Sequence, residues 1–144
     1  MELAAMERVR AEATIENPGD LVEVERGLRA PVDMRRIVVK DALADAGTTT
    51  LALPTRLVQQ LGLAKSYEKR GTSGVGTKSV SVPSAVCLAI PGRFFSVAGM
   101  EVPDDVPVFI GQIPLEMLDR TSDLQGRRFI GNPAHGHEHV LELY

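Results

Sequence analysis

The sequence predicts an all-β protein, folded as a single barrel with one or two short helices. Short runs of apolar and β-branched residues recur at close spacing along the 144-residue chain, and glycine, proline, asparagine or aspartate separates them. Only two short segments space their apolar residues as a helix does. The chain is long enough for one domain with its own core, and we expect a tail over residues 1–8 and one domain over 9–144.

Composition and charge argue against several classes of protein. A hydrophobic fraction of 44% and a charged fraction of 24% are ordinary for a globular protein. The net charge of -3 argues against nucleic acid as a partner, because phosphate binding needs a basic face. No apolar run approaches the ~20 residues that cross a bilayer, and Glu2, Glu7 and Arg8 leave no signal-like apolar core. We therefore expect a cytoplasmic protein without a membrane partner.

The N-terminal third of the chain predicts two strands and a connection between them. Apolar and polar residues alternate from Val9 to Ile15, as in a half-buried strand. The turn-forming residues Asn17 to Asp20 end this strand, and we expect an irregular surface connection over Leu21–Asp33. A second strand spans Arg36 to Ala44, with apolar residues at its centre.

The rest of the chain predicts short strands and two short helices. Pro54 opens a helix over Thr55–Leu61, which Gly62 ends. The glycine-rich residues 67–78 predict a mobile hairpin tip or loop. The further expected elements are strands over 80–82, 86–90, 94–97 and 106–110, a helix over Pro114–Leu118, two strands around a turn at 123–126, and a terminal strand over 139–144.

Two segments carry residues that are typical of a catalytic site. Asp45, Ala46 and Gly47 follow the second strand directly, and a threonine-rich turn begins at Thr48. Further along the chain, an apolar-apolar-glycine segment precedes the second helix and consists of Phe109, Ile110 and Gly111. Together the two segments resemble the active-site strand and the matching glycine segment of retropepsin-like (clan AA) aspartic proteases. The resemblance covers roughly residues 9–143. Within the family, the chain is similar to small bacterial aspartyl proteases.

The resemblance implies an acid-protease barrel that acts as a homodimer and cleaves peptide bonds as an aspartic endopeptidase. Asp45 would be the catalytic residue, in an active-site turn formed with Ala46, Gly47 and Thr48. The flap that closes over a peptide or protein substrate would be the segment Ser73, Gly74, Val75 and Gly76. The reaction of this family uses neither a metal nor a cofactor.

The chemistry explains why one aspartate per chain can suffice. Hydrolysis without a metal or a covalent nucleophile needs an activated water and a proton donor, and two adjacent carboxylates that share one proton supply both. One aspartate acts as the base toward water, and the other acts as the acid. The chain has one such motif, so the second carboxylate must be Asp45 of another copy in a dimer with two-fold symmetry.

Ala46 departs from the family, which has threonine or serine at this position. In the family that hydroxyl bonds the partner's backbone across the dimer axis, and alanine cannot. Two lost hydrogen bonds of about 1 kcal/mol each would weaken dimerisation roughly ten- to a hundredfold. Thr48 is not expected to compensate, because its side chain should point elsewhere. The alternative function is a catalytically weakened or inactive peptide-binding or dimerisation module with the same fold.

Three histidines and one cysteine are the remaining candidates for chemistry. His135, His137 and His139 alternate, so on a strand they would share one face, which is a possible metal geometry. A solvated tail is the favoured interpretation, because termini are loosely held, and a metal-dependent hydrolase ranks last. Cys87 lies in an apolar run and has no second cysteine to pair with, so we expect a small buried residue.

Overall fold

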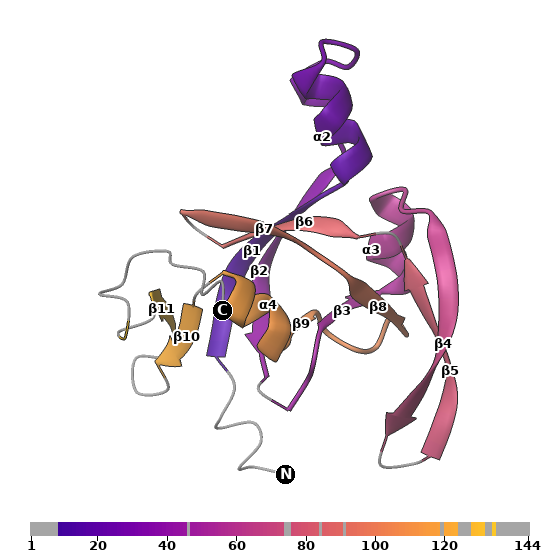
Figure 1. Ribbon diagram of the computed structural model, residues 1–144, viewed down its shortest axis with the longest axis vertical. Helices are drawn as coiled ribbons and strands as arrows, with labels where there is room; N and C mark the ends of the chain where they lie inside the picture. Colours follow the sequence, from indigo (N-terminus) through magenta and orange to yellow (C-terminus); the bar gives the residue numbers. More distant parts are fainter. Residues whose placement is uncertain are drawn as a thin grey trace.

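The computed structural model describes residues 9–45, 47–73, 76–83, 85–90, 92–118, 120–123, 128–131 and 134. Within these ranges the chain is mostly strand, with three short α-helices and one 3-10 helix (Figure 1). This confirms the expected mostly-β fold with short helices. No helix among the described residues is both long enough and apolar enough to span a membrane.

A seven-stranded sheet organises the structure, in the order β7-β6-β1-β2-β9-β3-β8. Strands β1, β2, β6 and β7 form an antiparallel run, while β9 pairs parallel with β2 and antiparallel with β3. The strand β8 pairs parallel with β3. The bounds are β1 Val9–Glu16, β2 Arg36–Ala44, β3 Leu51–Pro54, β6 Val86–Ile90, β7 Arg93–Val97, β8 Gly99–Val102 and β9 Phe109–Ile110.

The core is aliphatic and follows the alternation of the strands. In β1 the side chains of Val9, Ala13 and Ile15 are buried, while Arg10 and Glu12 are exposed. The β2 strand has the bounds that the sequence predicts. Leucines and isoleucines from β3, β6 and β9 complete the core, and complete burial of each such side chain stabilises the fold by roughly 1.5–3 kcal/mol.

The segment between β1 and β2 corrects the prediction of a turn followed by an irregular connection. Asn17 does not end β1 in a turn but caps α2 (Pro18–Glu25), and its side-chain oxygen accepts a hydrogen bond of 3.1 Å from the Asp20 N–H. Pro18 occupies the first helical turn, where its missing N–H costs nothing. A 3-10 helix, η1, spans Pro31–Asp33. Figure 1 shows α2 standing away from the sheet.

Asp20 holds this insertion together. Its buried carboxylate accepts hydrogen bonds from the Arg35 backbone N–H at 2.9 Å and from Nε and Nη2 of Arg35 at 2.8 and 2.9 Å. These bonds, with the nearby charge of Arg29, keep the pKa of Asp20 well below its usual range, although burial acts in the opposite direction. The α2 insertion is therefore fixed to the start of β2.

The insertion is also tied to α3 (Thr55–Gln60), the helix that follows β3. The side-chain amide of Asn17 donates a hydrogen bond of 2.8 Å to the carbonyl of Leu61. Gly62 then ends the helix with φ of 64°, a left-handed conformation that favours glycine. The predicted helix and its glycine stop are confirmed, with α3 one residue shorter than expected.

The remaining elements largely follow the sequence prediction. The glycine-rich residues 67–78 are an exception, because the structure has most of them in strands and not in a loop: β4 (Lys65–Ser73) and β5 (Gly76–Pro83) form an antiparallel hairpin. A second hairpin consists of β10 (Arg120–Asp123) and β11 (Arg128–Gly131). The helix α4 (Gln112–Met117) begins two residues earlier than predicted.

Two strand predictions need correction, and two segments lie outside the described residues. The expected strand over 106–110 is short, because only Phe109 and Ile110 pair in the sheet. The strand β8 is not predicted at all. Residues 1–8 and the expected terminal strand over 139–144 lie outside the described ranges.

Candidate active site

Asp45 lies where β2 leaves the sheet. Its backbone N–H donates a hydrogen bond of 3.1 Å to the carbonyl of Ile110, and two residues earlier the Leu43 N–H bonds the carbonyl of Val108 at 2.9 Å. Because β9 is parallel to β2 at this point, it holds the chain in register up to the aspartate. The side chain of Asp45 is half-buried, so it remains open to a ligand.

Both oxygens of the Asp45 carboxylate accept hydrogen bonds from the loop that follows. The backbone N–H of Gly47 donates to Oδ1 at 2.9 Å, and the hydroxyl of Thr48 donates to Oδ2 at 3.3 Å. Within this chain the Thr48 side chain points toward its own aspartate, and the Thr48 N–H also bonds the Asp45 carbonyl at 3.0 Å and closes a turn. This turn brings the hydroxyl back to the carboxylate. The expectation that Thr48 does not replace the missing hydroxyl of position 46 across the dimer axis stays a prediction.

Gly111 presses against the same loop. Its N–H donates to the carbonyl of Thr50 at 2.9 Å, and the next two N–H groups, of Gln112 and Ile113, donate to the carbonyls of Thr48 and Thr49 at 2.8 and 2.9 Å. The first N–H groups of a helix have no partners within it, so the loop carbonyls satisfy the start of α4. A Cβ at Gly111 would lie 2.5 Å from the Thr50 carbonyl oxygen and would also collide with Thr48.

The structure therefore brings together the two segments that the sequence singles out. The Asp45 turn and the segment Phe109, Ile110 and Gly111 are joined by backbone hydrogen bonds, with Ile110 fully buried. Ala46 lies outside the described residues. The three carbonyls of Thr48, Thr49 and Thr50 are a part of the site that sequence reasoning missed, and the only signal for them is the helix that starts directly after a glycine.

The expected flap is described in part. Ser73 ends β4 and pairs with Gly76, the first residue of β5, while Gly74 and Val75 lie outside the described residues. Gly76 has a φ of 125°, a backbone conformation that residues with a side chain rarely adopt. Figure 1 shows the free end of the β4–β5 hairpin and the loop between β2 and β3 at the same end of the molecule, away from α2.

Comparison with known proteins gives a limited result. No family model matches the chain, and no curated protein matches it. Solved structures that match include the solution structure of the simian foamy virus (mac) protease, which is 16% identical. The match covers 76% of this chain and 93% of the viral chain, with a TM-score of 0.49.

Metal and thiol chemistry concern the histidines, the acidic residues and the one cysteine of the chain. No group of three or more histidine, cysteine, aspartate or glutamate side chains there could hold a metal ion. His135, His137 and His139 lie outside the described residues. Cys87 is half-buried and not buried as expected. This partial burial raises the pKa of its thiol, and the nearby charges of Glu16 and Glu25 act in the same direction. A thiol held protonated in this way is a poor nucleophile.

Proposed function

We propose that this protein is an aspartic endopeptidase whose catalytic pair is Asp45 from each of two copies. The observation that carries the proposal is the fixed carboxylate of Asp45. It projects from the end of a sheet strand, and Gly47 and Thr48 hold its two oxygens. The close contact of Gly111 with the loop supports the same proposal, because it explains why both sequence segments are needed.

In the proposed reaction the two carboxylates share one proton. The ionised aspartate takes a proton from a water molecule, which attacks the peptide carbonyl carbon, and the protonated aspartate donates its proton to the carbonyl oxygen. Collapse of the tetrahedral intermediate breaks the C–N bond: the leaving amine takes the proton that the first aspartate removed from water, and a hydroxyl proton of the intermediate returns to the second aspartate. This chemistry uses neither a metal nor a cofactor. Closure of the hairpin around residues 73–76 would exclude water from the bound peptide.

The proposal requires a second copy, because the chain supplies one aspartate of this kind. Ala46 lacks the hydroxyl that would bond across the two-fold axis, so the dimer should be weaker than one with threonine at this position. Activity should therefore rise more steeply than linearly with protein concentration until the dimer is saturated. Replacement of Ala46 by threonine should lower the concentration at which this rise levels off by roughly ten- to a hundredfold.

The proposal is tested by cleavage of a mixture of unfolded proteins at mildly acidic pH, with and without a pepstatin-type inhibitor. Wild type should cleave and Asp45→Asn should not. Asp41→Asn is the matched control, because Asp41 is an exposed aspartate on the same strand and should be replaceable without loss of activity. Unchanged cleavage by Asp45→Asn would exclude Asp45 as the catalytic residue.

The alternative is a peptide-binding or dimerisation module with little or no cleavage, and Ala46 is the feature that favours it. Sedimentation of wild type and Ala46→Thr, measured beside the cleavage assay, separates the two functions. If both proteins dimerise and bind the inhibitor but neither cleaves, the module is the correct function. If Ala46→Thr gains both dimer stability and cleavage, the endopeptidase is supported and Ala46 limits its assembly.

A further inference from the structure

A row of small and apolar residues crosses the outward face of four neighbouring strands. In the register of the sheet, Val38 of β2 pairs with Thr14 of β1, Thr14 pairs with Ala89 of β6, and Ala89 pairs with Phe94 of β7. The side chains at the two ends are well exposed, Val38 by 49% and Phe94 by 72%. Residues paired across a sheet lie on the same face. The small side chains of Thr14 and Ala89 therefore form a depression between the larger side chains of Val38 and Phe94.

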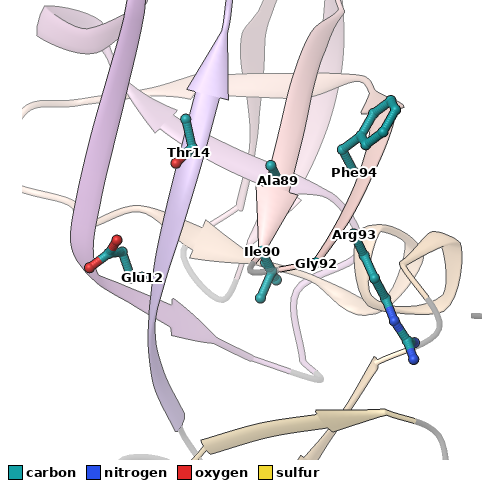
Figure 2. Close-up of a pocket in the computed structure, with 7 residues that line it drawn as sticks. All are labelled: Glu12, Thr14, Ala89, Ile90, Gly92, Arg93 and Phe94. Atoms are coloured by element: carbon teal, nitrogen blue, oxygen red, sulfur yellow. The ribbon is translucent and has the colours of Figure 1, made fainter. Parts of the chain in front are cut away.

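A depression of about 310 Å³ lies over the Phe94 end of this row, which we call the outer-face groove. Glu12 and Thr14 of β1, Ala89 of β6 and Phe94 of β7 line it, together with the turn that joins β6 to β7 (Figure 2). Thr14 and Ala89 have short side chains, so the middle of the groove is lower than the Phe94 ring. A stem of a few methylene groups could lie there in contact with apolar surface on two sides.

The charge of the groove comes from Glu12. This exposed residue sits at a bulge in β1, where the register with β2 shifts between Ala11 and Ala13. Bulges of this kind redirect side chains and are frequent beside functional sites. Among the described residues Glu12 has no hydrogen-bond or ion-pair partner. Glu16, on the same face of the same strand, lies 3.6 Å from Arg36.

Arg93 also lines the groove, but its guanidinium is directed toward the end of α4. Arg93 is 9% exposed, and its Nη1 donates a hydrogen bond of 3.0 Å to the carbonyl of Leu118 at the end of α4. Figure 2 shows the Arg93 side chain running away from Phe94. Arg10 and Lys40 are exposed on β1 and β2, but neither lines the groove. Glu12 is therefore the charged residue of the groove lining that has no partner among the described residues, and Figure 2 shows Glu12 and the Phe94 ring at opposite ends of the lining.

We propose that the outer-face groove binds an arginine side chain of a partner protein segment. The guanidinium would pair with the Glu12 carboxylate, where it can accept two parallel hydrogen bonds. Its methylene stem would lie over Ala89 and the Thr14 methyl group, against the face or edge of the exposed Phe94 ring. Arginine fits better than lysine, because its planar head is less strongly hydrated and stacks on aromatic rings.

This site is separate from the Asp45 loop and does not depend on the proposed function. Ala11 pairs with Ala42 and Ala13 pairs with Val39, so Glu12 lies opposite Lys40 and Asp41, which are five and four positions before Asp45. At about 3.3 Å per strand residue, Glu12 and Asp45 are roughly 15 Å apart along the strand. The groove would thus hold a partner or substrate at a distance from any cleavage.

The test is a titration of the ¹⁵N-labelled protein, followed by NMR, with the tripeptide acetyl-Gly-Arg-Gly-amide. The same peptide with citrulline is the matched neutral probe, because it has nearly the same shape without the charge. The arginine peptide should shift the amide signals of Thr14, Ala89 and Gly92 saturably, and citrulline should bind at least fivefold more weakly. Glu12→Gln should reduce arginine binding to the citrulline level, and Glu16→Gln should leave it unchanged.

Phe94→Ala should weaken both peptides and should still fold, because the Phe94 ring is largely exposed. Equal binding of arginine and citrulline, or no saturable shift with either, would overturn the proposal. So would full binding by Glu12→Gln. If the same signals shift with protein concentration alone, Phe94→Ala abolishes that shift, and the arginine peptide has no effect, the groove contacts a second copy of this chain and the proposal is wrong.

Discussion

The hydroxyl of Thr48 donates a hydrogen bond of 3.3 Å to Oδ2 of Asp45. The Gly47 N–H holds the other oxygen at 2.9 Å, so the plane of the carboxylate is fixed relative to its own loop. A carboxylate that must share a proton with a second copy has to present one oxygen in a defined direction. Thr48 is therefore a positioning residue in the proposed active site.

Thr48→Val should lower kcat/KM by roughly fivefold, because it removes one hydrogen bond worth about 1 kcal/mol at this length and exposure. Thr48→Ser keeps a hydroxyl and should restore most of the activity. The loss should appear in kcat rather than in KM, and the dimer measured by sedimentation should be unaffected. An equal loss in Thr48→Val and Thr48→Ser would point to packing of the methyl group instead of the hydroxyl.

Gly111→Ala should destabilise the fold by about 2 kcal/mol or more, because its Cβ would meet the carbonyl oxygens of Thr48 and Thr50, which backbone hydrogen bonds hold against the start of α4. Gly99→Ala is the matched control in β8, two strands from β9 in the sheet, where the nearest atom to a new Cβ is the Leu51 carbonyl oxygen at 3.3 Å. Urea denaturation of the two variants should show a much larger loss for Gly111→Ala. Similar losses would mean that the loop can move aside.

The sequence predicts the parts of this fold that depend on local pattern. Alternation from Val9 to Ile15 and the apolar centre of β2 determine two strands, and Pro54 with Gly62 bounds a helix. The strand β8 escapes prediction because its parallel pairing with β3 depends on residues far away in the chain. The local pattern of apolar and polar residues does not predict a pairing between such distant segments.

The candidate site follows the same division. Asp45, Gly47 and Gly111 can be selected from sequence, because each belongs to a short motif. The Thr48 hydroxyl cannot, since its contact with Asp45 depends on how the loop closes in three dimensions. The helix α2 escapes prediction for a similar reason. Asn17 is equally suited to a turn and to a helix cap, and Arg35 decides between them by binding Asp20 from the far end of the insertion.

Asn17 should be one of the most sensitive positions outside the core, because it serves two elements. Its oxygen caps α2, and its amide satisfies the buried Leu61 carbonyl. Asn17→Ala should cost about 2–3 kcal/mol, of which the cap accounts for about 1 kcal/mol. Asn17→Ser can still cap the helix but cannot reach Leu61, so it should lose less. The denaturant midpoints of the two variants test this order. Equal losses of stability in Asn17→Ala and Asn17→Ser would mean that the helix cap contributes nothing and that only the bond to Leu61 matters.

Asp20 should make the stability of the α2 insertion dependent on pH. The bonds from Arg35 hold the pKa of Asp20 below its ordinary value of 3.8, so the folded state binds this proton less readily than the unfolded state does. The stabilisation is therefore complete above the unfolded pKa and is lost as the pH falls below about 4 toward the folded pKa. Wild type should lose stability over this range.

Asp20→Asn should be less stable than wild type at neutral pH, and the gap should narrow as the pH falls. Asp104→Asn is the control, because Asp104 is 57% exposed and its ion pair with Nη1 of Arg56, at 3.9 Å, should contribute little. Asparagine keeps the oxygen that accepts the 2.8 Å hydrogen bond from the Arg56 backbone N–H. Urea denaturation midpoints at pH 7, 4 and 3 give the comparison. Parallel curves for wild type and Asp20→Asn would contradict the prediction, because they would mean that the charge of Asp20 contributes no more to the folded chain than to the unfolded one.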